Sequence, residues 1–414
     1  MLTKKKTALC LLVAVFMLST LLLPASAAYS DVDDNDWYAD AVNKWGNLLQ
    51  ADGAIEPGKT VTRGEFVHIL NGLLGFGQAD PKFTDVKGHK YEKDIGAFEK
   101  AGIVVGTAEG VFSPDDDLQR YQAAIMLGRV LGLDKGVDGF NYADSADLAV
   151  LNETAAAYQG ALNRGGYYNG TKVDYKTANE KVFSPERPFI RAEIFAMVNN
   201  MVKGGYINSA TAKPNVNAAD RHTEGNMIIA ASSKINDVSV VGDLIIAPKL
   251  GDGEVTLDNV IVTGSLYVRG GGVDSIIITG NSSIGRIVVD NAGSSAVRIA
   301  VEGKAVVAAV VVSGGAETEV IITGKVDVVV ITASVTLSLV DAEVGDLAVW
   351  VIAEIVIDED STVEVLEVFN DKVTIDNEGT IELAEVVEGV EITGDGEVED
   401  TETIEKPVND VYAA

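Results

Sequence analysis

One short pattern that occurs three times constrains the fold of this chain more than any other feature. A proline and an arginine stand six positions apart in each copy: Pro57 and Arg63, Pro114 and Arg120, Pro185 and Arg191. Each arginine begins a segment whose apolar residues recur at helical spacing, and another helical pattern lies upstream of each copy. The first half is therefore predicted to hold three helix–loop–helix units. Because none has core enough to stand alone, the three should pack as one bundle.

The first arginine lies inside a sequence that also has a simpler explanation. Thr62 and Glu65 have the spacing of a capping box, in which the two side chains satisfy free amides at a helix start. The second unit has glutamine at both of these positions, and the third has Ile190 in place of the threonine, yet the arginine is present every time. Capping does not explain the arginine.

A positive charge at a helix N-terminus opposes the helix dipole, and an anionic partner would reverse that penalty. A guanidinium beside free amides suits a carboxylate, so we favour anion binding. The alternative is an internal salt bridge to Glu65 or Glu193. The second unit, with Gln119 and Gln122, departs most from the pattern, and its groove is expected to be weak or purely structural.

The three units resemble S-layer homology (SLH) domains. That family has an F-x-D-V start, a first helix with tryptophan, a G-I-x-x-G turn, an F-x-P loop and a T-R-A-E motif opening the last helix. Gly102 to Gly106 and Gly110 to Pro114 match the turn and the loop closely. The resemblance covers roughly residues 29 to 205, with units expected at 28–78, 79–137 and 138–205.

The resemblance implies an all-α, pseudo-threefold helical bundle. Its grooves would hold a secondary cell-wall polysaccharide, often with a pyruvylated terminal sugar, and anchor the protein non-covalently to peptidoglycan. Carried onto this sequence, it predicts a binding set without catalytic or metal-ligating members. The set is Arg63, Glu65, Arg120, Arg191, Glu193, Asp31, Asp85, Asp144 and Trp37.

The N-terminus has the pattern of a secretory signal peptide, expected at residues 1–27. Three lysines precede an apolar run that ends in small residues at Ala25 to Ala27. Removal would take away Cys10, the one cysteine, so the mature chain would have no disulfide. A secreted protein of the cell wall, S-layer or cell surface is predicted, with no membrane partner after cleavage.

Composition changes near residue 225. Residues 1–225 hold 23 basic and 28 acidic side chains, whereas residues 226–414 hold 9 and 34. The net charge of -30 disfavours nucleic acid as a partner. The stretch 206–226, with Pro214 and several asparagines, is predicted to connect two domains.

Beyond this connector, short β-branched runs alternate with turn residues. Val260 to Gly264 recurs as Ile276 to Gly280, Val320 to Gly324 and Val390 to Gly394. Short strands repeating at about 20 residues predict an all-β parallel β-solenoid (β-helix) over 227–400. A β-sandwich is the alternative, and 401–414 would form an acidic tail.

The last coils carry most of the acids. Between Glu354 and Glu405 there are 19 acidic residues and one base, Lys372. Outward acids keep a long sheet soluble and guard its edge, although such a surface could also bind calcium, and an uncapped end could support self-association. The acids at 31–36 lack the glycine and the twelfth-position acid of an EF-hand loop, so they are interpreted as solvated turn residues. No other cofactor is predicted.

Some secreted solenoids are carbohydrate-active enzymes, which need clustered catalytic groups on one sheet. No histidine follows His222, and the arginines beyond it are Arg269, Arg286 and Arg298. We therefore predict a non-enzymatic protein that displays its solenoid as an S-layer, adhesin or structural element. A wall-attached carbohydrate-active enzyme is the alternative.

Overall fold

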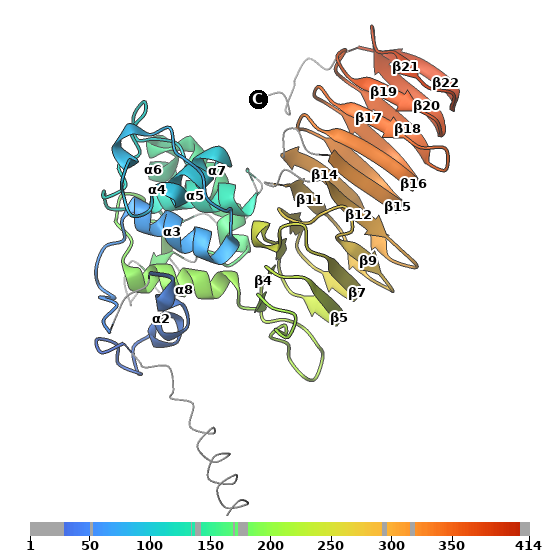
Figure 1. Cartoon of the computed structure of the whole chain (residues 1–414). Helices are drawn as coiled ribbons and strands as arrows, with labels where there is room; N and C mark the ends of the chain where they lie inside the picture. The colour runs from blue at the N-terminus through green and yellow to red at the C-terminus, as the bar shows by residue number, and fades with distance from the viewer. Residues whose placement is uncertain are drawn as a thin grey trace, which may run out of the picture.

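The computed structural model has a helical N-terminal part followed by a parallel β-solenoid (Figure 1). The expected signal peptide lies outside the described residues. In the part of the chain that the model describes, no helix is long and apolar enough to cross a membrane. The described residues are 29–49, 53–133, 135–136, 142–168, 170–172, 181–291, 296–314 and 319–405.

Three helices of the N-terminal part begin at the repeat arginines, as the sequence pattern predicts. They are α3 (Arg63–Leu74), α5 (Arg120–Leu131) and α8 (Arg191–Met201). The other elements of this part are α2 (Ala39–Trp45), η1 (Gly46–Leu49), η2 (Thr84–Val86), α4 (Glu92–Lys100), α6 (Ser145–Leu151), α7 (Glu153–Arg164), β1 (Thr171–Lys172) and β2 (Lys181–Val182).

The third residue of each of these helices satisfies a free amide at the helix start. Glu65 accepts a hydrogen bond from the amide of Thr62, and the Thr62 hydroxyl accepts one from the amide of Glu65, which completes the capping box. Gln122 and Glu193 accept from the amides of residues 119 and 190 in the same way. Half of the capping box is therefore kept in all three copies.

The C-terminal part is a long sheet wound into coils. The described strands that belong to this sheet pair in parallel, over about 10 turns. The early strands are β3 (Gly205–Ile207), β4 (Met227–Ile229), β5 (Ser233–Val240), β6 (Leu244–Ile246), β7 (Val255–Val262), β8 (Leu266–Val268), β9 (Ile277–Thr279), β10 (Ser283–Ile284), β11 (Ile287–Asp290), β12 (Val297–Val301) and β13 (Val306–Val307), with η3 (Pro248–Leu250) between β6 and β7.

The later coils have longer strands. They are β14 (Ala309–Gly314), β15 (Glu319–Ile331), β16 (Thr336–Val349), β17 (Glu354–Ile357), β18 (Thr362–Val368), β19 (Thr374–Asn377), β20 (Thr380–Val387), β21 (Ile392–Thr393) and β22 (Glu397–Ile404). β22 pairs with β20 through Ile404, so the sheet continues into the stretch expected as an acidic tail.

Alternating aliphatic side chains form the solenoid interior. In β6 and β8, Leu244 stacks on Leu266 and Ile246 on Val268, and all four are fully buried. Each coil thus covers the apolar residues of the next. At one corner, the Asn259 side chain donates to Asp237, which lies 22 positions earlier. Farther along, Lys325 pairs with Glu343, 18 positions away, so the later coils are shorter.

The helical part and the first coils share one hydrophobic core. Ile228, Ile245, Tyr267 and Val288 are the middle residues of their early strands and cluster with residues of the helices, whereas their neighbours on the strands face the solenoid interior. These strands are therefore buried on both sides, which is why they read as continuous apolar runs. Figure 1 shows α8 running toward β4.

Polar contacts reinforce this junction. The buried Arg269 pairs with Asp290 at 2.8 Å and donates to the carbonyl of Arg129 at 2.8 Å. The buried hydroxyl of Tyr167 donates to Asp243 at 2.9 Å. The structure differs here from the predicted connector at 206–226: Tyr206 lies in β3, because the fully buried Ile207 beside it belongs to the solenoid core.

Candidate functional site

The acids at the unit starts all make the same pair of hydrogen bonds. Asp31 accepts from the amides of Ile55 and Glu56, Asp85 from Phe112 and Ser113, and Asp144 from Phe183 and Ser184. The second residue of each pair has a positive φ of 51°, 58° or 54°. Each aspartate therefore holds the loop before a repeat arginine in an uncommon backbone conformation. These contacts give the three acids a structural role, and their part in binding stays a prediction.

The electrostatics of Asp85 follow from this geometry. Burial raises the pKa of its carboxyl, but the amides of Phe112 and Ser113 and the nearby Arg63 outweigh that effect, and the net shift is downward. The charged form of the carboxylate is thus the one that the loop stabilises.

The repeat arginines contact the next unit in a cyclic order. The amide of Arg63 donates to the carbonyl of Asp116, that of Arg120 to Arg187, and that of Arg191 to Lys59. All three arginine side chains are buried, with 3% to 8% of their surface exposed. A buried guanidinium needs an anionic or carbonyl partner, so the partners distinguish the three copies.

Both terminal nitrogens of Arg191 are paired inside the protein, and only its buried Nε has no hydrogen-bond acceptor among the described residues. Its Nη2 donates to Glu65 at 2.7 Å, and its Nη1 donates to the carbonyl of Ile55 at 2.9 Å and to Glu56 at 3.2 Å. Here the internal salt bridge is formed. Glu65, predicted as a ligand-binding residue, is the carboxylate that closes this position.

Arg120 is only partly satisfied. Its Nη1 lies 4.0 Å from Glu193, which also accepts from Arg187 at 2.5 Å. The Nε and Nη1 atoms of Arg120 find no hydrogen-bond acceptor among the described residues. Its guanidinium lies over the rings of Tyr168 and Phe189, at 4.7 and 5.0 Å from their centres. Burial, followed by the charge of Arg187, lowers the pKa of Arg120 to about 10.

Arg63 has no carboxylate partner within the described part of the chain. Its Nε donates to the carbonyl of Phe112 at 2.9 Å, and its guanidinium lies 4.5 Å from the centre of that ring. Burial lowers the pKa of Arg63. The side chain borders a cavity of about 290 Å³, which is lined by no acid. Other lining residues are Val104, Thr107, Tyr121, Gln122, Ile125, Arg129 and Asn152.

One residue type explains this difference. The Glu at the third helix position of the first unit pairs with Arg191, and its equivalent in the third unit approaches Arg120. The second unit has Gln122 there, beside Arg63. The departure of the second unit from the motif therefore leaves Arg63 without an internal acid. From Gln122 the sequence predicted only a weak groove in the second unit. The missed signal was that Gln in place of Glu removes the negative charge opposite Arg63.

The remaining predicted residue, Trp37, lies apart from this cavity. Its side chain is 68% exposed and contacts Tyr38 edge to face. Trp37 does not line the Arg63 cavity, whereas Arg129 and Asn152, which were not predicted, do. Arg129 comes from the last turn of α5 and Asn152 from the junction of α6 and α7, so only folding brings them together.

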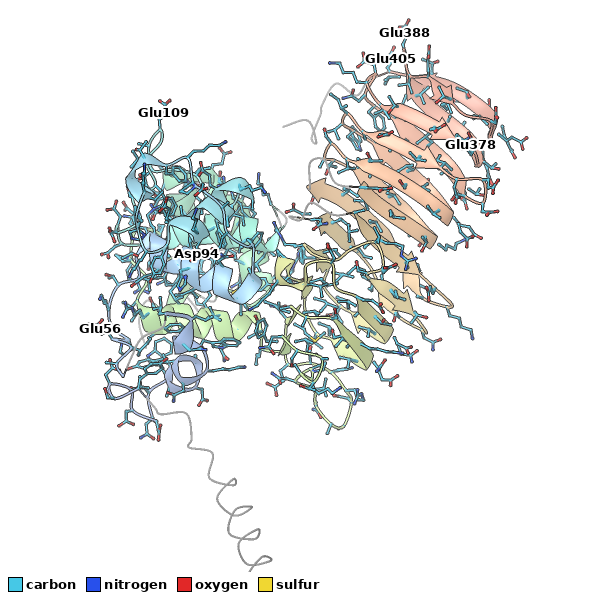
Figure 2. All side chains as sticks on the ribbon, viewed as in Figure 1. Glu56, Asp94, Glu109, Glu378, Glu388 and Glu405 are labelled. Carbon is cyan, nitrogen blue, oxygen red and sulfur yellow. The ribbon has the colours of Figure 1, made fainter. Side chains whose placement is uncertain are left out.

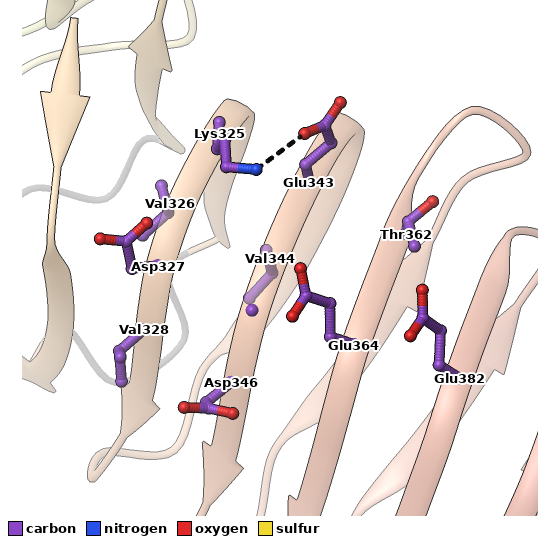
Figure 3. Close-up of a pocket in the computed structure, with 11 residues that line it drawn as sticks. Lys325, Val326, Asp327, Val328, Glu343, Val344, Asp346, Thr362, Glu364 and Glu382 are labelled. Atoms are coloured by element: carbon purple, nitrogen blue, oxygen red, sulfur yellow. Dashed lines mark hydrogen bonds and ion pairs between the residues drawn. The ribbon is translucent and has the colours of Figure 1, made fainter.

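A second cavity, of about 530 Å³, lies on the solenoid (Figure 3). Acids from four neighbouring strands line it: Asp327, Asp346, Glu364 and Glu382, with Glu343 paired to Lys325 at 3.3 Å. Figure 2 labels further acids, Glu378, Glu388 and Glu405, at the end of the solenoid far from the helices. In the described residues, no three His, Cys, Asp or Glu side chains are placed to hold a metal ion. Calcium binding stays a prediction.

Comparison with known proteins agrees with the helical part. A model of the S-layer homology domain matches residues 82–124, which include η2, α4 and Arg120. An S-layer protein of Bacillus thuringiensis subsp. finitimus and the S-layer protein sap of Bacillus anthracis are each 33% identical over 146 residues, or 33% of this chain and 18% of theirs. A cell wall amidase of Bacillus anthracis is 34% identical over 91 residues, 21% of this chain and 17% of the amidase.

The chain thus spans less than a fifth of the length of these relatives. The matched domain and the relatives support the class of secreted, cell-wall-associated surface proteins. Within that class, the chain is similar to S-layer homology domain proteins, with the match at residues 82–124.

Proposed function

We propose that the helical part comprises three SLH units that bind an anionic secondary cell-wall polysaccharide and hold the solenoid at the cell surface. The cyclic contacts of the three arginines and the matching aspartate bonds support a pseudo-threefold arrangement of units. Only the second unit is covered by the family match, so the first and third rest on these repeated contacts.

The observation that carries this proposal is the cavity beside Arg63. It joins two cations, Arg63 and Arg129, to apolar side chains and to the amides of Gln122 and Asn152, with no acid in the lining. A carboxylate such as a pyruvyl group would pair with the buried guanidinium, and sugar hydroxyls would bond to the amides. Arg120, with its free donors, is the second binding position, and Arg191 is structural.

Wall binding by the full chain tests the proposal. Purified cell walls are compared before and after removal of their secondary polymer, and we expect binding to fall at least about tenfold on the stripped walls. Equal binding to both preparations would contradict the anchoring role.

The residue assignment has a sharper test. Gln122→Glu adds, beside Arg63, the carboxylate that the first and third units already carry, without removing any cation. We expect it to lower wall affinity about tenfold, as Arg63→Gln does, because an internal ion pair replaces the ligand. Lys82→Gln, at an exposed site outside the cavity, is the control. If Gln122→Glu and Arg63→Gln both bind cell walls as tightly as the wild type, the binding site is not the Arg63 cavity.

We further propose that the chain is not itself an enzyme and that its solenoid is an S-layer, adhesin or structural element. The absence of histidine after His222 and the few arginines on the solenoid support this. The alternative, a carbohydrate-active enzyme, is favoured by the acidic cavity of Figure 3. Turnover of an acidic polysaccharide that is lost on Asp346→Asn would establish it.

A further inference from the structure

A groove with a volume of about 490 Å³ lies where the helical part meets the solenoid. The segment from α2 to η1 and the last turn of α3 form its helical side. β3, the loop that follows β3, and η3 form its solenoid side. The groove shares no lining residue with the cavity of Arg63. It exists only because the two parts are docked together.

Positive charge converges on this groove in an otherwise acidic protein. Lys44, Lys213 and Lys249 line it, and no acid does. All three are exposed, and none forms an ion pair with another described residue. Ten of the eleven lining residues lie within residues 1–225, which hold 23 basic and 28 acidic side chains, so three lysines without an acid exceed the local balance. The local field favours an anionic ligand.

Two of the lysines are held in place. The Lys249 ammonium donates to the carbonyl of Gly72 at 3.1 Å and to the Tyr206 hydroxyl at 3.5 Å. The Lys44 ammonium lies 4.9 Å from the centre of the Trp45 ring. The contact with the carbonyl near the end of α3 explains the position of Lys249 without a ligand, because a cation there complements the helix dipole. Lys44 and Lys213 have no such explanation.

The rest of the lining suits a saccharide better than a bare ion. Asn47, Asn208 and Asn215 present amides that can donate to and accept from hydroxyl groups. Trp45 and Tyr206 pack edge to face at 5.6 Å and give the floor two aromatic rings. The volume lies in the range of small-ligand sites. Nucleic acid is disfavoured by the overall charge of -30.

We propose that this junction groove binds an anionic saccharide, with Lys44 and Lys213 pairing with its carboxylate or phosphate and the asparagine amides binding its hydroxyl groups. The site is separate from the Arg63 cavity and does not depend on the function proposed there. It would give the chain a second saccharide contact, built partly from the solenoid.

Calorimetric titration of the full chain tests the proposal with three probes. Tetragalacturonate carries carboxylates, glycerol phosphate carries a phosphate, and maltotetraose is a neutral sugar of matched length. We expect at least one acidic probe to bind about tenfold more tightly than maltotetraose. The stronger acidic probe then identifies the anion.

A pair of double variants locates the binding. Lys44→Gln with Lys213→Gln should weaken the acidic probe about tenfold. Lys82→Gln with Lys87→Gln, which removes the same charge from exposed sites on the helical part, should leave it within twofold. The same pair of double variants made in an Arg63→Gln background, where the wall-binding cavity is weakened, should show the same difference, which separates this groove from the wall-binding site. Equal binding of all three probes, or equal loss in both double variants, would overturn the proposal.

Discussion

At the scale of single residues, the three repeats differ through one carboxylate. Arg63, Arg120 and Arg191 occupy equivalent positions, yet they differ in their carboxylate partners: Arg63 has none among the described residues, Arg120 lies 4.0 Å from one, and Arg191 pairs with two. A buried cation without a carboxylate is costly unless a ligand supplies one. The second unit, which departs most from the motif, therefore leaves Arg63 of the first unit as the arginine most available to a ligand. The sequence pattern had predicted the opposite, a weak groove at the second unit.

The aspartates at the unit starts give a residue-scale prediction. Asp85→Ala leaves the amides of Phe112 and Ser113 without their acceptor, and we expect a loss of about 1 to 2 kcal/mol in the free energy of unfolding. Asp34→Ala, at an exposed turn, should change little. Chemical denaturation at pH 7 measures both, and equal stability of the two variants would contradict the role of Asp85.

The pH dependence of this effect has a definite sign. Because the folded-state pKa of Asp85 is lowered, its charged form stabilises the fold above the ordinary value of 3.8, and that contribution is lost as the pH falls through the lowered pKa. The difference in unfolding free energy between the wild type and Asp85→Ala should therefore shrink on acidification below pH 3.8. A difference that grows would exclude this explanation.

At the scale of elements, backbone conformation sets the corners of the solenoid. Gly324 has a φ of +80°, and a Cβ added there would lie 1.9 Å from the carbonyl oxygen of Val301. The pairing of β15 with β16 shifts register at this point. Gly324→Ala should cost about 2 kcal/mol or more, because backbone would have to move. Gly285→Ala, where the Cβ meets open space, is the control, and equal thermal stability of the two would refute the argument.

The acidic strands carry a second element-scale prediction. Glu367 on β18 lies beside Glu385 on β20. Burial, then the charges of Glu385 and Asp346, raise its pKa. An acid whose pKa is raised by folding stabilises the fold below its unfolded-state pKa, and that stability is lost as the pH rises through the raised folded-state pKa. Glu367→Gln should therefore raise the melting temperature at pH 7 by about 2 °C, with less effect near pH 4. Glu364→Gln, exposed on the same strand, should do less.

Elements were predicted well where periodicity is strong and poorly where it is ambiguous. The arginines at helix starts followed from Pro-to-Arg spacing, and the parallel solenoid followed from short aliphatic runs. The recurring glycines did not give the coil length. Gly242 and Gly264 lie on neighbouring coils at one corner, where the amide of Gly264 donates to the carbonyl of Gly242. Gly280 follows β9, and Gly324 follows Ile322 within β15, so these two glycines mark another corner. Similar motifs therefore mark different corners.

The candidate site was predicted only in part for a physical reason. Arg63 belongs to a local motif, but Arg129 and Asn152 reach its cavity through contacts between units, which no local pattern records. The junction was not predicted either. A short apolar run such as Leu244 to Ile246 has the same sequence pattern whether one or both faces of its strand are buried. The sequence therefore did not indicate which coils pack against the helices.

At the scale of the whole molecule, the shared core predicts coupled unfolding. Asp290→Asn leaves the buried Arg269 without its carboxylate and should destabilise the junction by about 3 kcal/mol. Hydrogen exchange should then accelerate in α5 and α7 as well as in β8 and β11. Asp376→Asn, exposed on β19, should alter exchange only locally. Protection of the helices unchanged by Asp290→Asn would show that the two parts unfold independently.

The docked junction also fixes a length. Neighbouring coils in a parallel sheet are about 4.8 Å apart, so about 10 turns extend roughly 5 nm. Because Tyr267, Arg269 and Asp290 hold the first coils against the helices, this extension starts from a set direction instead of from a loose tether. A chain held to a surface by its helices would carry its most acidic coils at a constant distance from the attachment point.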